Sequence, residues 1–172
     1  MTDSALDDQI AEARSRDRPD VLIFPPLIPL ATVMAGCGLQ WLAPLGGLAK
    51  FDSGLRWGIG AVVLVTGLLM AAAGKFALKR HGTNISPLHP STALVTDGIF
   101  ERTRNPLYVG MTVALCGIAV ILALDWIPLL LVPACFVLHF AVVRPEEGYL
   151  ERKFGDAYCA YRQRVPRYLP GS

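Results

Sequence analysis

The sequence predicts an all-α integral membrane protein with about four transmembrane helices, a cytoplasmic loop and a C-terminal amphipathic helix. Of its 172 residues, 53% are hydrophobic and 17% are charged, and the mean hydropathy is +0.44. Soluble proteins carry roughly a quarter charged residues. The charges here crowd into segments that leave four apolar runs almost free of charge. Buried helices of soluble proteins seldom stay uncharged for so long, so the lipid bilayer is the expected solvent.

The four apolar runs cover residues 21–43, 57–74, 105–124 and 126–143. Each is close to the ~20 residues that a helix needs to cross ~30 Å of hydrocarbon. We therefore predict four membrane spans. A single charged residue, Asp125, separates the last two runs, so these must form a tight antiparallel hairpin.

The placement of lysine and arginine predicts the orientation of these spans. Of the 16 basic residues, 14 lie near the start of the first span, between the second and third, or after the fourth. Only Lys50 and Arg56 lie in the opposite connection. The positive-inside rule then places both termini and the 75–104 loop in the cytoplasm. This bias explains the net charge of +2, and we see no nucleic-acid footprint in it.

The first 20 residues alternate acids with arginines and contain no apolar core, so they are not a signal peptide. We expect a short surface helix or a disordered cytoplasmic tail there, followed by one membrane domain over residues 21–172. Cys37, Cys116 and Cys135 lie inside predicted spans, and no two cysteines have CxxC spacing. Neither a disulfide nor a metal site is expected.

Prolines and glycines mark the first two spans. Three prolines within residues 25–29 remove amide donors from the start of the first span and should kink or delay its helix. The second span carries Gly58, Gly60 and Gly67. Small residues let membrane helices approach closely, so we expect this helix to pack tightly against a neighbour.

The connection over residues 81–104 is too polar and irregular to cross a membrane. A connector of this length in so small a protein is usually functional, and the alternative is a disordered tether. After the fourth span, apolar residues recur at intervals of four, four and three, at Leu150, Phe154, Tyr158 and Tyr161. This spacing predicts an amphipathic helix over about residues 146–165, on the inner leaflet or on the protein's own cytoplasmic face.

The predicted hairpin sets the start of the third span beside the end of the fourth. The polar residues that it brings together are Arg104, Asn105, Tyr108, Arg144, Glu146 and Glu147. Adjacent residues on a helix diverge by about 100°, so Glu146 and Glu147 cannot easily face one substrate atom. We expect one to accept a cationic ligand group and the other to pair with an arginine or a backbone amide. The alternative is a salt-bridge cluster that only fixes the helix ends.

His139 is an ionisable residue inside the fourth span, and such residues suggest function. Seven residues separate it from Glu146, so the two share a helix face if the helix continues through Pro145. A catalytic histidine and a structural one, hydrogen-bonded across the bundle, both fit the sequence.

Several segments carry a family resemblance. Residues 104–110 read RNPLYVG, residues 144–150 read RPEEGYL and residues 154–158 read FGDAY. In this order they resemble the isoprenylcysteine carboxyl methyltransferase and phospholipid methyltransferase superfamily, which has an Arg-His/Asn-Pro-x-Tyr-x-Gly stretch and a downstream Glu-Glu pair. The upstream residues 82–87 and 94–100 resemble its bacterial branch. The resemblance covers roughly residues 75–168.

The resemblance implies a multi-pass enzyme of the bacterial inner membrane that uses S-adenosyl-L-methionine, with the C-terminal helix capping a cytoplasmic cofactor site. It implies a cofactor-binding set of Gly98, Arg104, Asn105, Tyr108, Gly110, Glu146, Glu147 and Tyr158. The candidate catalytic residues are Arg104, Asn105, His139 and Glu147. Asn105 stands where many members have histidine, and Ile99 replaces a common proline.

We therefore expect a methyltransferase whose lipophilic or lipidated substrate enters from the bilayer. Prenylated cysteine carboxylates, phospholipid amines, hydrophobic acids and thiols are all compatible acceptors, and membrane lipids are the expected surroundings. Two alternatives stay open. One is an NADPH-dependent enzyme like the sterol reductases, which share an Arg-His-Pro-x-Tyr-like stretch. The other is a non-catalytic membrane protein that binds lipids or other partners.

Overall fold

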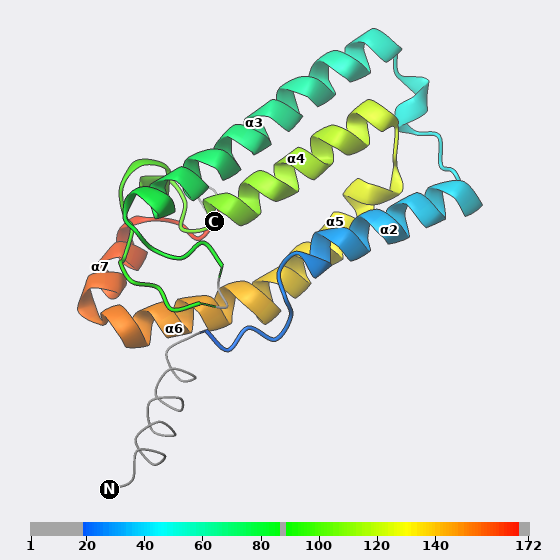
Figure 1. Cartoon of the computed structure of the whole chain (residues 1–172). Helices are drawn as coiled ribbons and strands as arrows, with labels where there is room; N and C mark the ends of the chain where they lie inside the picture. The colour runs from blue at the N-terminus through cyan, green and yellow to red at the C-terminus, as the bar shows by residue number, and fades with distance from the viewer. Residues whose placement is uncertain (1–18, 87–88, 169–172) are drawn as a thin grey trace, which may run out of the picture.

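The computed structural model describes residues 19–86 and 89–168, and this part of the chain is a bundle of helices (Figure 1). The first four helices are α2 (Leu27–Leu42), α3 (Ser53–Arg80), α4 (Pro106–Leu122) and α5 (Trp126–Leu138). A π-helical turn at His139–Val143 leads into α6 (Arg144–Phe154), which is followed by α7 (Asp156–Arg164). Short 3₁₀ turns occur at Leu48–Lys50 and Gly98–Glu101. The expectation for residues 1–20 lies almost wholly outside the described residues.

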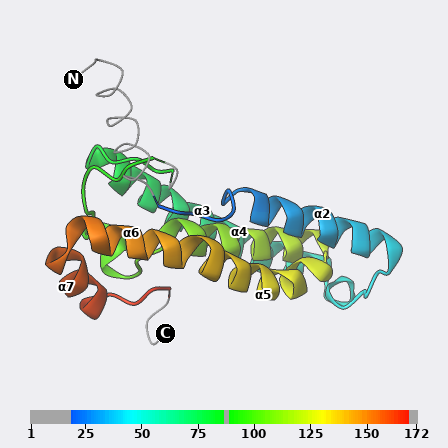
Figure 2. The same cartoon turned by 90° about the horizontal axis from the view of Figure 1, so that it is seen from below.

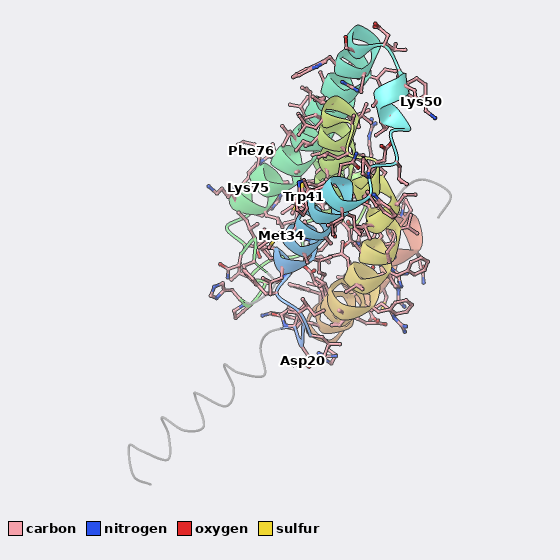
Figure 3. The ribbon with its side chains drawn as sticks, turned by 90° about the vertical axis from the view of Figure 1, so that its right-hand side faces the viewer. Asp20, Met34, Trp41, Lys50, Lys75 and Phe76 are labelled. Carbon is pink, nitrogen blue, oxygen red and sulfur yellow. The ribbon has the colours of Figure 1, made fainter. Side chains whose placement is uncertain are left out.

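The described chain is helical, as predicted, and it contains two candidate membrane-spanning helices. These two, Ser53–Arg80 and the continuous helix Trp126–Phe154, are long and apolar enough to cross a bilayer. The apolar helices α2 and α4 are shorter, at 16 and 17 residues. Large hydrophobic side chains cover the outside of the bundle, and Figure 3 shows Met34, Trp41 and Phe76 among them. A surface of this kind suits lipid rather than water.

The first predicted span is shorter as a helix than the apolar run. Its helix begins at Leu27, not at residue 21, and the chain before it is not helical. Pro25 and Pro26 lack the amide hydrogens that a helix requires, which explains the delayed start. The second span is longer than predicted, because α3 continues to Arg80.

Helices α3 and α4 lie side by side and pack through glycines (Figure 1). A Cβ on Gly67 would overlap the backbone of Ala114, and one on Gly110 would lie 2.6 Å from the Ala71 nitrogen. Gly60 packs in the same interface, so the predicted close approach of the second span is confirmed for Gly60 and Gly67. Gly58 faces away from it, and a Cβ added there would have nothing within 4 Å.

Helix α2 lies along α5, and the hairpin between α4 and α5 is tight, as predicted. Ala123 adopts a left-handed conformation with φ of 55°, and the Leu124 amide donates to the Ala119 carbonyl at 2.9 Å. At the same end, the Trp126 indole donates to the Ala43 carbonyl at 2.7 Å. These contacts join α4 to α5 and α5 to the end of α2, at the end of the bundle opposite α6 and α7.

The helix that begins with α5 does not break at Pro145. Proline cannot donate to the helix ladder, and its ring crowds the carbonyl four residues earlier. The chain widens into a π turn just before it, where the Arg144 amide bonds the His139 carbonyl. The fourth apolar run therefore continues into α6 as one helix that extends past the predicted end of the span.

The predicted C-terminal helix over residues 146–165 is two helices. Gly155, with φ of 52° and ψ of −128°, separates α6 from α7 and changes the chain direction. Tyr158 and Tyr161 of α7 are buried against Val95 and Phe100 of the loop. The apolar face of α7 therefore packs on the protein itself, which was one of the two expected positions.

Candidate functional site

A cavity of about 460 Å³ lies at the end of the bundle that carries α6 and the loop. One part of its wall is apolar and comes from residues 24–29, from Met111 and Leu115 of α4, and from Leu131 and Leu138 of α5. The other part is ionic and comes from Arg104, Asn105, Tyr108, Glu146, Glu147 and Tyr158. The cavity thus joins a polar end to an apolar chamber.

Glu147 is the centre of the ionic end. Its Oε1 lies 2.6 Å from Nη1 of Arg104, and its Oε2 lies 2.8 Å from Nη2 of Arg167. Arg167 Nε also donates to both oxygens at 3.0 Å. Glu147 is only 8% exposed, so this carboxylate is buried and compensated by two guanidinium groups. Both oxygens of Glu147 are therefore already paired with arginines of the protein.

Glu146 is placed differently, on the cavity wall. Its Oε2 accepts a hydrogen bond from the Tyr108 hydroxyl at 3.0 Å. Within residues 19–86 and 89–168, no cation forms an ion pair with Glu146. The predicted pairing of one carboxylate with arginine is found at Glu147, and the proposed ligand role of the other remains a prediction for Glu146.

Arg104 also lines the cavity, and one of its donors has no partner among the described residues. Its Nη1 bonds Glu147 and also donates to the Tyr158 hydroxyl at 3.2 Å. Its Nε is buried and has no hydrogen-bond partner in the described part of the chain. A buried donor without a partner costs free energy, so an anionic or carbonyl oxygen at this position would be stabilised.

The chain after α7 turns back along the bundle and closes one side of the ionic end (Figure 2). We call residues 165–168 the C-terminal strap. The Arg104 amide donates to the Pro166 carbonyl at 3.0 Å, and the Thr103 hydroxyl donates to the Arg167 carbonyl at 3.1 Å. Asn105 Nδ2 donates to the same carbonyl at 3.0 Å. The side chain of Asn105 thus holds the strap at the cavity wall.

Tyr158 lies beneath Arg104 and is almost fully buried. Burial raises the pKa of its hydroxyl to about 12, and the negative charge of Glu147 acts in the same direction. The phenol is therefore neutral near pH 7, and its oxygen accepts the hydrogen bond from Arg104.

Three predicted site residues do not line the cavity. Gly98 is exposed in a turn of the loop with φ of 61°, and Gly110 is buried against α3. His139 bonds the Tyr168 hydroxyl through Nδ1 at 2.8 Å. The predicted shared face of His139 and Glu146 is wrong, because the π turn between them changes the rotation per residue.

The described part of the loop is ordered by specific contacts, so it is not a disordered tether. The Ser91 amide donates to the buried Tyr149 hydroxyl at 3.0 Å, and the Thr92 amide donates to the Thr83 hydroxyl at 3.0 Å. His81 Nε2 lies 3.0 Å from Asp97 Oδ1, and this hydrogen bond lowers the pKa of Asp97. The loop thereby covers the cavity from the side of α6.

Sequence reasoning missed two parts of the site. Arg167 follows the proline that ends α7, and no motif in the sequence marks it as the second partner of Glu147. The prolines within residues 24–29 predict only a kinked or delayed helix, yet this segment also contributes to the apolar wall of the cavity. An apolar, proline-rich segment before a helix is the only signal that could have pointed to them.

The fold and the site define a helical protein with membrane-type helices and a ligand cavity that is ionic at one end. The chain belongs to the phospholipid methyltransferase family, whose match covers residues 55–157. The match begins in α3, contains Arg104, Glu146 and Glu147, and ends just before Tyr158. It leaves out α2 and the C-terminal strap.

Two curated relatives share parts of the chain. The protein-S-isoprenylcysteine O-methyltransferase of Schizosaccharomyces pombe is 37% identical over 78 residues, which cover 45% of this chain and 33% of that protein. The nickel-cobalt-cadmium resistance protein NccN of Alcaligenes xylosoxydans xylosoxydans is 32% identical over 134 residues, or 75% of this chain and 58% of that protein. The chain thus spans less than two thirds of the length of either relative.

Proposed function

We propose that this protein is an integral membrane methyltransferase that transfers a methyl group from S-adenosyl-L-methionine to a lipophilic substrate. The observation that carries the proposal is the form of the cavity, in which Arg104 and Glu146, a carboxylate with no ion-pair partner among the described residues, line one end of an apolar chamber. The family match supports the same reaction class. We see no feature of the cavity that favours the reductase alternative or a non-catalytic role.

The four apolar helices α2, α3, α4 and α5 would each cross the membrane in this proposal. At about 1.5 Å per residue, the 16 residues of α2 cover about 24 Å, which suffices if the chain before it also lies at the interface. By the positive-inside rule, the basic residues at the α6 end support an orientation with the ionic end of the cavity in the cytoplasm of a bacterial cell. The cofactor reaches that end from water, and the substrate reaches the apolar chamber from lipid.

The residues present fit the charges of S-adenosyl-L-methionine, which carries an ammonium, a carboxylate and a sulfonium group. Glu146 is the proposed acceptor for the ammonium group, and Arg104 Nε is the proposed donor to the carboxylate. Tyr108 orients Glu146, and Glu147 orients Arg104. When bound, the cofactor supplies an electrophilic methyl group.

The chain itself contributes alignment and the exclusion of water. Methyl transfer is an in-line displacement that removes positive charge from sulfur, so it gains most from a fixed geometry in a dry site. The apolar walls from α4, α5 and residues 24–29 provide such a site. His139 lies off the cavity and is not proposed as a base, whereas a carboxylate acceptor needs none.

The direct test uses the full chain purified in a mild detergent. Calorimetry should detect binding of S-adenosyl-L-methionine, and NADPH should not bind under the same conditions. Incubation with methyl-labelled cofactor and a bacterial lipid extract should then transfer label into the lipid fraction. Binding of NADPH without binding of S-adenosyl-L-methionine would contradict the proposal, as would cofactor binding without label in any lipid fraction.

A further inference from the structure

A second cavity, of about 550 Å³, lies between α7 and the C-terminal strap, and its charge is strongly positive. We call it the arginine groove. It is lined by Arg104, Arg162, Gln163, Arg164, Val165, Pro166, Arg167 and Tyr168. Four of these eight residues are arginines, and no acidic residue is among them. Such a groove attracts anions.

Two carboxylates outside the groove balance only part of this charge. Glu147 serves both Arg104 and Arg167, and Glu151 pairs with Arg162 at 2.7 Å. Arg164 is exposed and donates through Nε to the Ala160 carbonyl at 3.3 Å. The groove therefore keeps an excess of guanidinium groups over carboxylates, with Arg164 available to an additional anion.

The arginine groove adjoins the π turn that follows α5. Tyr168, at one end of the groove, bonds His139 at 2.8 Å, and the His139 ring lies 4.7 Å from the Phe140 ring. The Arg144 guanidinium in turn lies over Phe140, 5.7 Å from its ring centroid.

An apolar strip leads up α5 to this point. Val132, Phe136 and Phe140 follow one another at intervals of four residues, and they are 60%, 62% and 55% exposed. Eight residues of helix span about 12 Å, a length that fits part of an acyl chain. The strip ends at the aromatic ring that carries Arg144. The apolar strip thus leads to a positive charge, as the acyl chains of a membrane leaflet lead to its headgroups.

We propose that this surface is a binding site for an anionic phospholipid of the leaflet at the α6 end. The phosphate is held by Arg164 in the arginine groove, Arg144 lies beside the headgroup at Phe140, and an acyl chain lies along Val132, Phe136 and Phe140. Guanidinium groups bind phosphate oxygens through paired, charge-assisted hydrogen bonds, whereas a zwitterionic lipid adds its own cation to the groove. The site rests on the membrane placement of α5 and does not depend on methyl transfer.

Lipid retention by the full chain tests this site. The protein is reconstituted into nanodiscs of equal phosphatidylglycerol and phosphatidylcholine, transferred to mild detergent and examined by native mass spectrometry. The wild type should retain phosphatidylglycerol preferentially. The double variant Arg144→Gln/Arg164→Gln should bind it about 30-fold more weakly, since each basic residue near the surface contributes roughly a fivefold factor.

The double variant Lys79→Gln/Arg80→Gln is the matched control. It removes the same charge from the exposed end of α3, and neither residue lines the groove. It should retain phosphatidylglycerol like the wild type, and both variants should unfold at the wild-type temperature. Equal losses in the two variants would show a non-specific charge effect and overturn the proposal. Displacement of the lipid by millimolar inorganic phosphate would also overturn it, because the groove would then recognise a free anion.

Discussion

Arg167 and Glu147 form a bidentate ion pair in which the guanidinium of the C-terminal strap reaches the first turn of α6 at 2.8 Å. The same carboxylate holds Arg104 at the start of the third apolar run. One buried charge therefore ties together three segments that are far apart in the sequence. The stability of the ionic end depends on it.

Glu147→Gln should destabilise the protein by about 3–5 kcal/mol, because it leaves two guanidinium groups without their common counter-charge. Unfolding of the purified protein in detergent, followed by circular dichroism, measures the loss. The matched control is Glu151→Gln, which breaks the exposed pair with Arg162 and should cost less than about 1 kcal/mol. Similar losses in the two variants would contradict a special role for the buried pair.

Glu146→Gln should weaken S-adenosyl-L-methionine binding by about 10- to 100-fold and change stability little. The amide oxygen can still accept from Tyr108, but the charge that is proposed to hold the ammonium group is lost. Calorimetry on both forms gives the ratio of dissociation constants. Glu151→Gln again serves as the control, and unchanged affinity in Glu146→Gln would remove this residue from the proposed cofactor site.

Gly67→Ala should destabilise the α3–α4 pair by about 1–3 kcal/mol, because the added methyl group meets the backbone of α4. Gly58→Ala on the same helix meets nothing within 4 Å and should be neutral, or stabilising by up to about 1 kcal/mol through helix propensity. Thermal unfolding in detergent separates the two. A neutral Gly67→Ala would show that the helices can move apart without cost.

Asn105→Asp should loosen the C-terminal strap. Asparagine donates to the Arg167 carbonyl, whereas a carboxylate oxygen faces that carbonyl with a second acceptor. Hydrogen exchange followed by mass spectrometry should show peptides over residues 165–168 exchanging about tenfold faster. Peptides of α3 provide the internal control, and faster exchange there as well would indicate general unfolding instead.

Stability should fall as the pH rises from about 10 toward 12. Burial raises the pKa of Tyr158 to about 12 from an ordinary value of 10, so its contribution is complete below pH 10 and is lost as the pH approaches 12. Burial raises the pKa of Tyr168 to about 12 as well. Tyr158→Phe removes one of these groups, so its unfolding temperature should fall less between pH 9 and pH 11 than that of the wild type. An identical slope would show that Tyr158 does not contribute.

Much of the ionic end could be predicted from the sequence because a tight hairpin leaves little choice of neighbours. Once Asp125 is taken as the turn, the start of α4 must lie beside the start of α6, and the pair Tyr108–Glu146 confirms it. Helix geometry also predicts that the two glutamates point in different directions, but it does not say which of them pairs with arginine.

The rest depended on features that local pattern does not encode. The strap contacts of Asn105 and Arg167 join residues that are 62 positions apart, so no periodicity predicts them. Gly110 is part of a family motif, but it is buried against α3 and serves helix packing. The sequence alone does not distinguish a glycine that packs against a helix from one that approaches a ligand. The position of His139 could not be predicted, because it depends on a local change of helix type.

The π turn fixes how far α6 is rotated relative to α5 within one continuous helix. The π turn at His139–Val143 holds an extra residue relative to an α-helix, and one residue corresponds to about 100° of rotation. A single deletion within it would leave the exposed apolar residues of α5 in place and rotate Glu146 and Glu147 away from their partners. The number of residues in the π turn therefore decides whether the ionic end can assemble.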